Sequence, residues 1–174
     1  MSILICYDGS PSAQYALAQA ADSISQAAPQ HDDVTLLHVW NEPLQAPADS
    51  FSYRADPTGP SAERLVDVEQ GRAYSRIEEG RALATEHGLA AHTLIASNVS
   101  TVAATILRIA DEQDSSLIVV GAHQRGTPGP SLESTSGAVI ANSSRPVLVI
   151  PLAKSVAGGP LATGTAQAPS PTPA

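Results

Sequence analysis

The chain has 174 residues, of which 43% are hydrophobic and 3% aromatic, and its formal net charge is −8. This is enough apolar sequence for one domain with a sizeable core of Ala, Val, Leu and Ile. The acidic balance argues against nucleic acid and anionic membranes as partners, since both attract basic patches. No stretch reaches the ~18 apolar residues of a membrane span, the start lacks the basic region of a signal peptide, and Cys6 is the single cysteine. We therefore expect a cytoplasmic protein.

Strand-like and helix-like patterns alternate along the chain. Short apolar runs bounded by turn residues predict strands that are buried on both faces, and apolar residues spaced three and four apart predict helices. The predicted strands span residues 3–7, 34–39, 92–96, 117–120 and 146–151. The predicted helices begin at residue 11, near residue 60, within residues 97–100 and after residue 134 or 136. The apolar positions expected to face the core are, on the second helix, Leu65, Val68, Ala73, Ile77 and Ala84, and, on the third, Val102, Ile106, Ile109 and Ala110. This alternation implies a parallel sheet with helices on both faces.

Turn and cap residues mark several boundaries. The Asp8-Gly9 pair predicts a turn after the first strand, and Ser10 is expected to cap the helix that follows. Gly88 suits the end of the long second helix. Prolines bound the last strand, which predicts an edge of the sheet that is open to pairing with a second copy.

Two segments lack any such pattern. Residues 40–59 form a long irregular stretch, in which Trp40, Phe51 and Tyr53 could cover a bound ring or simply pack on the domain. Residues 153–174 are rich in Ala, Gly and Pro and are expected to be a disordered tail. We therefore predict one domain over residues 1–152.

Four stretches of the sequence resemble the universal stress protein family. They are similar to its first, second, fourth and fifth strands and span Ile3–Ser10, Val34–Val39, Leu117–Gly121 and Arg145–Ile150. The resemblance covers about residues 2–151 and implies an α/β fold: a Rossmann-like open five-stranded parallel sheet in the order 3-2-1-4-5, with helices on both faces. It also implies a homodimer paired through the last strand, from Pro146 to Pro151.

The nucleotide-binding branch of that family carries the motif Gly-x2-Gly-x9-Gly-Ser/Thr. Its first glycine matches Gly121, but Gln124 stands in the place of the second. Strict spacing puts Ser134 in the third glycine place and Thr135 in the hydroxyl place. Counting back from the last strand instead puts Glu133 and Ser134 there, so two registers stay open.

The departures from the motif affect a phosphate site directly. A side chain at residue 124 stands where backbone amides would approach the phosphates, and a carboxylate at residue 133 would repel them. His123, Arg125 and Gly126, which lies two positions late, could restore part of the site. We therefore predict weak or absent ATP binding. ATP or AMP remains a possible cofactor, with Mg²⁺ only when a nucleotide is bound.

Asp8 lies at the carboxyl end of the first strand, at the expected topological switch point of the sheet. The resemblance implies that this carboxylate contacts the adenine or ribose end of a ligand, whereas the residues alone are explained by a turn that caps the next helix. The resemblance also places the backbone of Val39 at the adenine edge. The candidate site thus combines strand ends with one loop, namely Asp8, Val39, Gly121, His123, Arg125, Gly126, Ser134 and Thr135.

The residues leave three functions open. The first is a stress-response binding or signalling module without a dedicated catalytic centre, acting on a protein partner that the sequence does not identify. The second is an adenine-nucleotide-binding protein with slow ATP hydrolysis, in which Arg125 replaces missing amides. The third is an enzyme of a related fold, for which Ser134 and His123 are the candidate groups. The histidines show no metal-ligand spacing with Cys or carboxylates, so no metal site is predicted. Because Cys6 and His38 lie within predicted strands, we expect a buried, inert thiol and a hydrogen-bonded core histidine.

Overall fold

The computed structural model describes residues 2–27, 33–41, 62–98, 100–122 and 134–152. The strands and helices, in chain order, are β1 (Ser2–Cys6), α1 (Pro11–Ala27), β2 (Asp33–Trp40), α2 (Ala62–Glu86), β3 (His92–Ser97), α3 (Val102–Glu112), β4 (Leu117–Ala122), α4 (Thr135–Asn142) and β5 (Val147–Pro151). Each predicted strand and helix is present. The expectations for residues 42–59, 123–133 and 153–174 fall outside the described residues.

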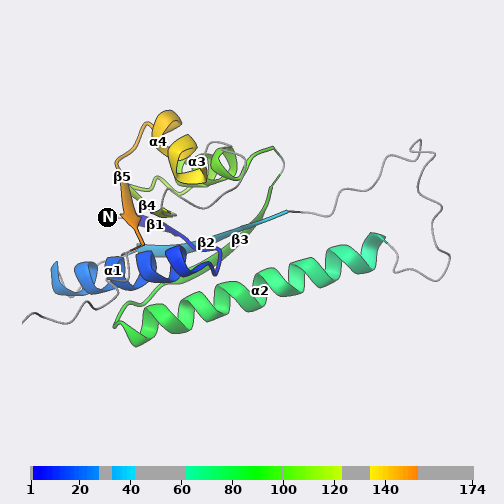
Figure 1. Ribbon diagram of the computed structural model, residues 1–174, viewed down its shortest axis with the longest axis horizontal. Coiled ribbons are helices and arrows are strands. Elements are labelled where there is room, and N and C mark those ends of the chain that lie inside the picture. The colour runs from blue at the N-terminus through cyan, green and yellow to red at the C-terminus, as the bar shows by residue number, and fades with distance from the viewer. Residues whose placement is uncertain (1, 28–32, 42–61, 99, 123–133, 153–174) are drawn as a thin grey trace, which may run out of the picture.

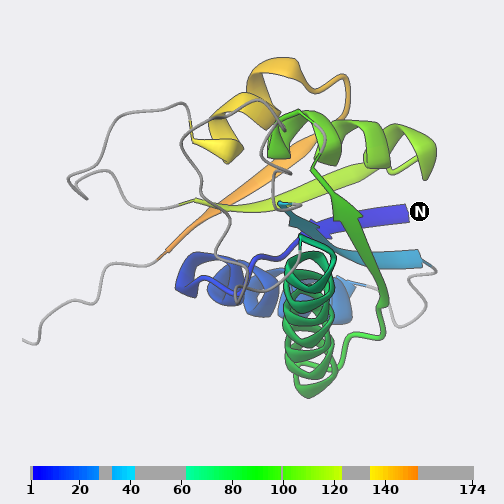
Figure 2. The same cartoon turned by 90° about the vertical axis from the view of Figure 1, so that its right-hand side faces the viewer.

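The strands form one parallel sheet in the order β3-β2-β1-β4-β5, which confirms the predicted topology and the edge position of β5. Helices α1 and α2 cover one face, and α3 and α4 cover the other (Figures 1 and 2). The chain reverses its direction of travel across the sheet between β1 and β4. In an open parallel sheet, this switch point is where a ligand cavity is expected.

Strand β1 lies at the centre of the sheet and is buried on both faces. Ile5 is aligned with Leu36 of β2 and with Val119 of β4. Its side chain joins the core beneath α1 and α2, whereas the neighbouring Leu4 joins the core beneath α3 and α4. Successive strand residues point to opposite faces, so an unbroken apolar run is what such a strand requires.

The cap predicted at the start of α1 and the glycine predicted at the end of α2 are both confirmed. The Ser10 hydroxyl oxygen accepts a hydrogen bond from the Ala13 amide at 3.3 Å, which satisfies a free N–H group of the first turn of α1. At the end of α2, Gly88 has a φ of +74°, and the Leu89 amide donates to the Ala84 carbonyl at 2.8 Å. This is the left-handed ending for which glycine is best suited.

Helix α3 begins later than predicted. We expected it to start within residues 97–100, but its cap is Thr101, whose hydroxyl accepts from the Ala104 amide at 3.1 Å. The Asn98 side chain instead accepts from the Ser100 amide at 3.2 Å and so closes a separate turn before the helix. Asn98 and Thr101 could each cap a helix, and the local sequence does not decide between them.

Helix α2 extends past the sheet, and its packing changes along its length (Figure 1). Its predicted apolar positions Ala73, Ile77 and Ala84 are buried, whereas Val68 is 50% exposed. Gly80 forms a notch for the ring of Tyr7, because a Cβ atom at Gly80 would lie 2.8 Å from that ring. The middle of α2 therefore packs directly on the end of β1.

The two glycines of α2 provide a matched test of this contact. Gly71 has open space around its Cα, so Gly71→Ala should raise the free energy of unfolding by about 0.5–1 kcal/mol through helix propensity alone. Gly80→Ala should instead lower it by about 1–3 kcal/mol, because the added methyl group overlaps the Tyr7 ring. Urea unfolding of both variants measures the difference. Equal effects would contradict the packing of Tyr7 on α2.

Candidate functional site

A cavity of about 350 Å³ opens at the carboxyl ends of β1, β2 and β4. The predicted site residues Asp8, Val39, Gly121, Ser134 and Thr135 all line this cavity. The remaining candidates His123, Arg125 and Gly126 lie outside the described residues. The structure thus brings together residues that are far apart in the sequence, at the switch point where the strand order predicted a site.

Asp8 serves the turn and faces the cavity at the same time. Its Oδ1 atom accepts a hydrogen bond from the Ser10 amide at 2.9 Å, and the following Gly9 has a φ of +77°. These contacts confirm the turn interpretation of the Asp8-Gly9 pair. Asp8 also lines the cavity, so its carboxylate remains available to a ligand hydroxyl on that side.

Helices α1 and α4 both begin at the cavity, and each begins with a pair of hydroxyl groups. The Ser134 oxygen accepts from the Gly137 amide at 3.1 Å and caps α4, which identifies Ser134 rather than Ser136 as the cap. The Ser136 hydroxyl lies 3.2 Å from that of Ser134, and the Ser12 hydroxyl lies 3.0 Å from that of Ser10. Helix N-termini carry a partial positive charge, so this end of the cavity favours an anionic group.

Another part of the lining is apolar. It consists of Leu37 and Val39 from β2, Val102 and Ile106 from α3, and Val120 from β4. A small-molecule site of this size is usually apolar with a few placed polar groups, and the cavity has that composition. It can therefore accept a flat apolar ring at one end and an anion at the other.

Sequence reasoning missed several of these lining residues. Val102 and Ile106 were expected only in the core, since helical periodicity does not distinguish a buried side chain from one that lines a cavity. Ser12 and Ser136 were missed although a signal existed. The same Ser-x-Ser pattern starts both α1 and α4, in Ser10–Ser12 and Ser134–Ser136.

Gly121 is needed for packing before any ligand is considered. A Cβ atom there would lie 2.7 Å from the Ser12 carbonyl oxygen, so the end of β4 and the first turn of α1 approach backbone to backbone. We interpreted this glycine as a place where amides approach a phosphate. The structure supplies a second reason for it, because a side chain at this position would force α1 away from the sheet.

Burial keeps Cys6 and His38 in their neutral forms. Cys6 lines the cavity, and burial raises the pKa of its thiol to about 12, in accord with the predicted inert cysteine. His38 is buried on the other face of β2, where its Nδ1 atom lies 2.8 Å from the Tyr7 carbonyl oxygen. Burial lowers the pKa of His38, so this ring is a neutral, hydrogen-bonded core residue as predicted.

The described part of the chain holds neither a metal-binding cluster nor a membrane-spanning helix. No group of three or more His, Cys, Asp or Glu side chains there is placed to hold a metal ion. No helix of the described ranges is long and apolar enough to cross a membrane. Exposed carboxylates are engaged with arginines instead, for example Glu78 with Arg81 and Asp111 with Arg145.

Comparison with known proteins agrees with this geometry. The model of the universal stress protein family matches residues 1–151. A solved structure of that family from Burkholderia pseudomallei is 25% identical, covers 86% of this chain and 94% of its own, and has a TM-score of 0.63. No protein among curated sequences matches this chain significantly.

Two further solved structures contain nucleotides. The universal stress protein from Archaeoglobus fulgidus in complex with dAMP is 20% identical, with 86% of this chain and 97% of that chain covered and a TM-score of 0.58. A universal stress protein family member from Arabidopsis thaliana with AMP bound is 16% identical, with 88% and 93% covered and a TM-score of 0.60. These likenesses show a shared fold.

Burial of the Cys6 thiol predicts a pH dependence of folding. Its pKa rises from a usual value of 9.0 to about 12, so the folded protein keeps a proton that the unfolded chain releases as the pH rises. The free energy of unfolding should therefore fall with rising pH above about 9, by up to about 1.4 kcal/mol per pH unit. Urea unfolding on both sides of that pH measures how steeply the free energy of unfolding falls. Cys6→Ala should remove the part of that slope that comes from the thiol. An unchanged slope in Cys6→Ala would show that the thiol is not buried.

Proposed function

This chain belongs to the universal stress protein family, and we propose that it acts in the stress response as a binding module whose cavity takes an adenosine monophosphate. One observation carries the proposal: the cavity joins an apolar wall to two serine-capped helix N-termini. A nucleoside monophosphate has the matching shape, with a flat ring at one end and a single anionic group at the other. The family structures with AMP and dAMP support this choice of ligand.

The nucleoside end would occupy the cavity between β1, β2 and α3. Val39 ends the apolar wall of β2, and its backbone would meet the adenine edge. Asp8 follows β1, the strand that pairs with β2, and would accept a hydrogen bond from a ribose hydroxyl. Both positions depend on rigid strand ends, so the nucleoside site does not require the glycine motif.

The phosphate would lie at the start of α4. Ser134 and Thr135 line the cavity there, and a single phosphate needs only the amides and hydroxyls of one helix N-terminus. A triphosphate needs additional amides from the loop after Gly121, where Gln124 replaces a glycine. Each missing charge-assisted hydrogen bond weakens binding by about 1.5–3 kcal/mol, so the monophosphate should be preferred.

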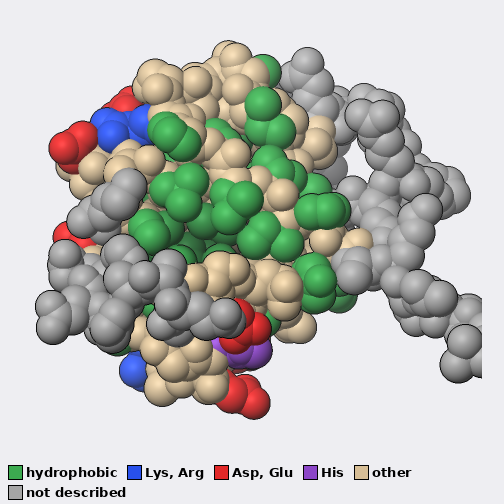
Figure 3. Space-filling view, turned by 90° about the vertical axis from the view of Figure 1, so that its left-hand side faces the viewer, with side chains coloured by type: hydrophobic (Ala, Val, Ile, Leu, Met, Phe, Trp, Pro, Cys, Tyr) green, Lys and Arg blue, Asp and Glu red, His purple; other side chains and the backbone are tan. Residues whose placement is uncertain are grey.

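A second proposal concerns assembly. Strand β5 ends the described sheet and pairs with β4 alone, and Leu148 on β5 is 42% exposed. Ile140 on α4 is 53% exposed. Figure 3 shows hydrophobic side chains gathered on the side of the molecule that carries β5 and α4. We propose that two copies pair through residues 146–151 and bury these side chains.

Nucleotide titration by calorimetry tests the ligand. We expect AMP to bind more tightly than ATP, and Gln124→Gly to raise the affinity for ATP with little change for AMP. Ser134→Ala should weaken AMP binding by about tenfold or more, since it removes a hydroxyl beside the phosphate. Ser23→Ala is the control, because it also removes a serine hydroxyl that bonds to helix backbone, but Ser23 lies in the C-terminal part of α1 and does not line the cavity.

Other results would change the proposal. Tighter binding of ATP than of AMP in the presence of Mg²⁺ would favour the alternative function, an ATP-binding protein with slow hydrolysis. Arg125→Ala should then abolish the affinity. If neither nucleotide binds, the cavity has another ligand, and the protein acts through a protein partner.

The oligomeric state tests the role of β5. Leu148→Asp should convert a dimer into a monomer in analytical ultracentrifugation, because it buries a carboxylate in the proposed interface. Val68→Asp provides the control, since Val68 is similarly exposed, at 50%, but lies on α2. A dimer that survives Leu148→Asp, or that Val68→Asp disrupts equally, would contradict pairing through β5.

A further inference from the structure

The turn that forms one side of the cavity is held from the far side of the sheet. Two successive carbonyl groups of this turn are bound by side chains that do not line the cavity. His38 Nδ1 lies 2.8 Å from the Tyr7 carbonyl oxygen. Arg76 of α2 donates from Nη1 to the Asp8 carbonyl oxygen at 2.9 Å. The backbone between β1 and α1 is thus fixed from behind, while Asp8 faces the ligand space.

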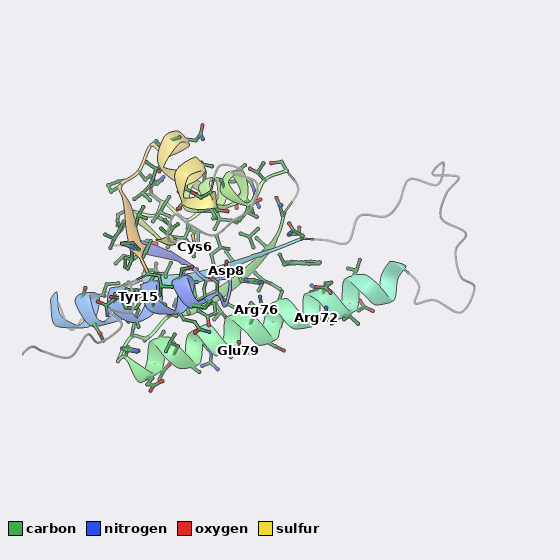
Figure 4. The ribbon with its side chains drawn as sticks, viewed as in Figure 1. Cys6, Asp8, Tyr15, Arg72, Arg76 and Glu79 are labelled. Atoms are coloured by element: carbon green, nitrogen blue, oxygen red, sulfur yellow. The ribbon has the colours of Figure 1, made fainter. Side chains whose placement is uncertain are left out.

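Arg76 also packs along the turn. A Cβ atom on Gly9 would lie 2.9 Å from Arg76 Cδ, so the aliphatic part of the arginine lies directly against this glycine. In Figure 4, Arg76 extends from α2 toward Asp8 at the end of β1. One helical turn later, Gly80 receives the ring of Tyr7. Helix α2 therefore contacts the turn at two places on the same helical face.

These contacts separate two roles within the turn. The Asp8 carboxylate bonds to the Ser10 amide and starts α1, whereas the Asp8 carbonyl bonds to Arg76. The guanidinium does not compete with a ligand for the carboxylate. Its charge strengthens the hydrogen bond to the carbonyl, and its planar group holds one direction better than an ammonium would.

We propose that Arg76 is a positioning residue of the cavity, which places Asp8 and the start of α1 for ligand binding through the Asp8 carbonyl. This inference rests on the proposed function for its effect on affinity. Its structural part stands on the contacts alone. Arg76 lies on α2, outside the glycine motif. Its contact with the turn makes α2 a determinant of the site.

Arg72 provides a matched control on the same helix. It lies one turn before Arg76 and carries the same charge, but its side chain is 70% exposed and pairs with Glu69 (Figure 4). Arg76→Ala and Arg72→Ala therefore remove equal charge from α2, and only the first removes a contact with the turn. Arg76→Lys keeps the charge and one donor, which makes it the rescue variant.

The single cysteine reports on the turn without any ligand. Cys6 is half-buried in the cavity wall, two residues before Asp8, so its rate of reaction with a small maleimide reports how accessible this part of the wall is. The rate should rise roughly five- to thirtyfold in Arg76→Ala and stay within about twofold in Arg72→Ala. Arg76→Lys should lie between Arg76→Ala and the unchanged protein. Circular dichroism melting shows that each variant is folded at the labelling temperature.

AMP titration of the same variants tests the effect on the site. The dissociation constant should rise roughly three- to thirtyfold in Arg76→Ala, with partial recovery in Arg76→Lys and no comparable change in Arg72→Ala. An unchanged labelling rate in Arg76→Ala, or equal changes in both alanine variants, would overturn the positioning role. Faster labelling with unchanged AMP affinity would overturn its link to binding. If the unchanged protein does not bind AMP, the proposed ligand fails, and the labelling rates still decide the role of Arg76.

Discussion

The close approach of α1 to the end of β4 determines the shape of the ligand cavity. Gly121 and the Ser12 carbonyl meet at a distance that leaves no room for a Cβ atom. This contact brings the first turn of α1 against the sheet at the switch point, beside the start of α4. Two helix N-termini then share one cavity, and their partial charges act on the same small volume. Any side chain at residue 121 would separate the two helix N-termini and remove the feature that most favours an anion.

A second constraint comes from α2, which covers the same face of the sheet as α1. The turn after β1 leads directly into α1, and its carbonyl groups are held by His38 and Arg76. Because Tyr7 is locked into the notch at Gly80, the turn has little freedom to follow a ligand. A preorganised site loses less entropy when it binds, so this rigidity favours a small ligand with few contacts. The cavity thus depends on α2 even though α2 does not line it.

Much of the fold was predictable because its signals are local. Apolar runs such as Leu117–Val120 have to be buried on both faces, and Ser10 and Gly88 mark helix ends by their own chemistry. The site was predictable where it coincides with strand ends, as for Asp8 and Val39. The contact of Arg76 was not predictable, since 68 residues separate it from Asp8 and an exposed helical arginine carries no local signal. Val68 failed as a core position for a related reason, because nothing local shows where a helix passes the edge of its sheet.

The net charge of −8 bears on how an anion could bind here. At physiological ionic strength, charges more than about 8 Å apart are largely screened, so the acidic surface acts weakly inside the cavity. The backbone amides at the starts of α1 and α4 would lie in direct contact with an anion bound in the cavity and would not be screened in that way. Affinity should therefore depend on the number of amides that reach the phosphates rather than on the charge of the whole molecule. In the proposed function, the number of phosphates bound would depend on the residues after β4, and binding of the nucleoside would depend on the ends of β1 and β2.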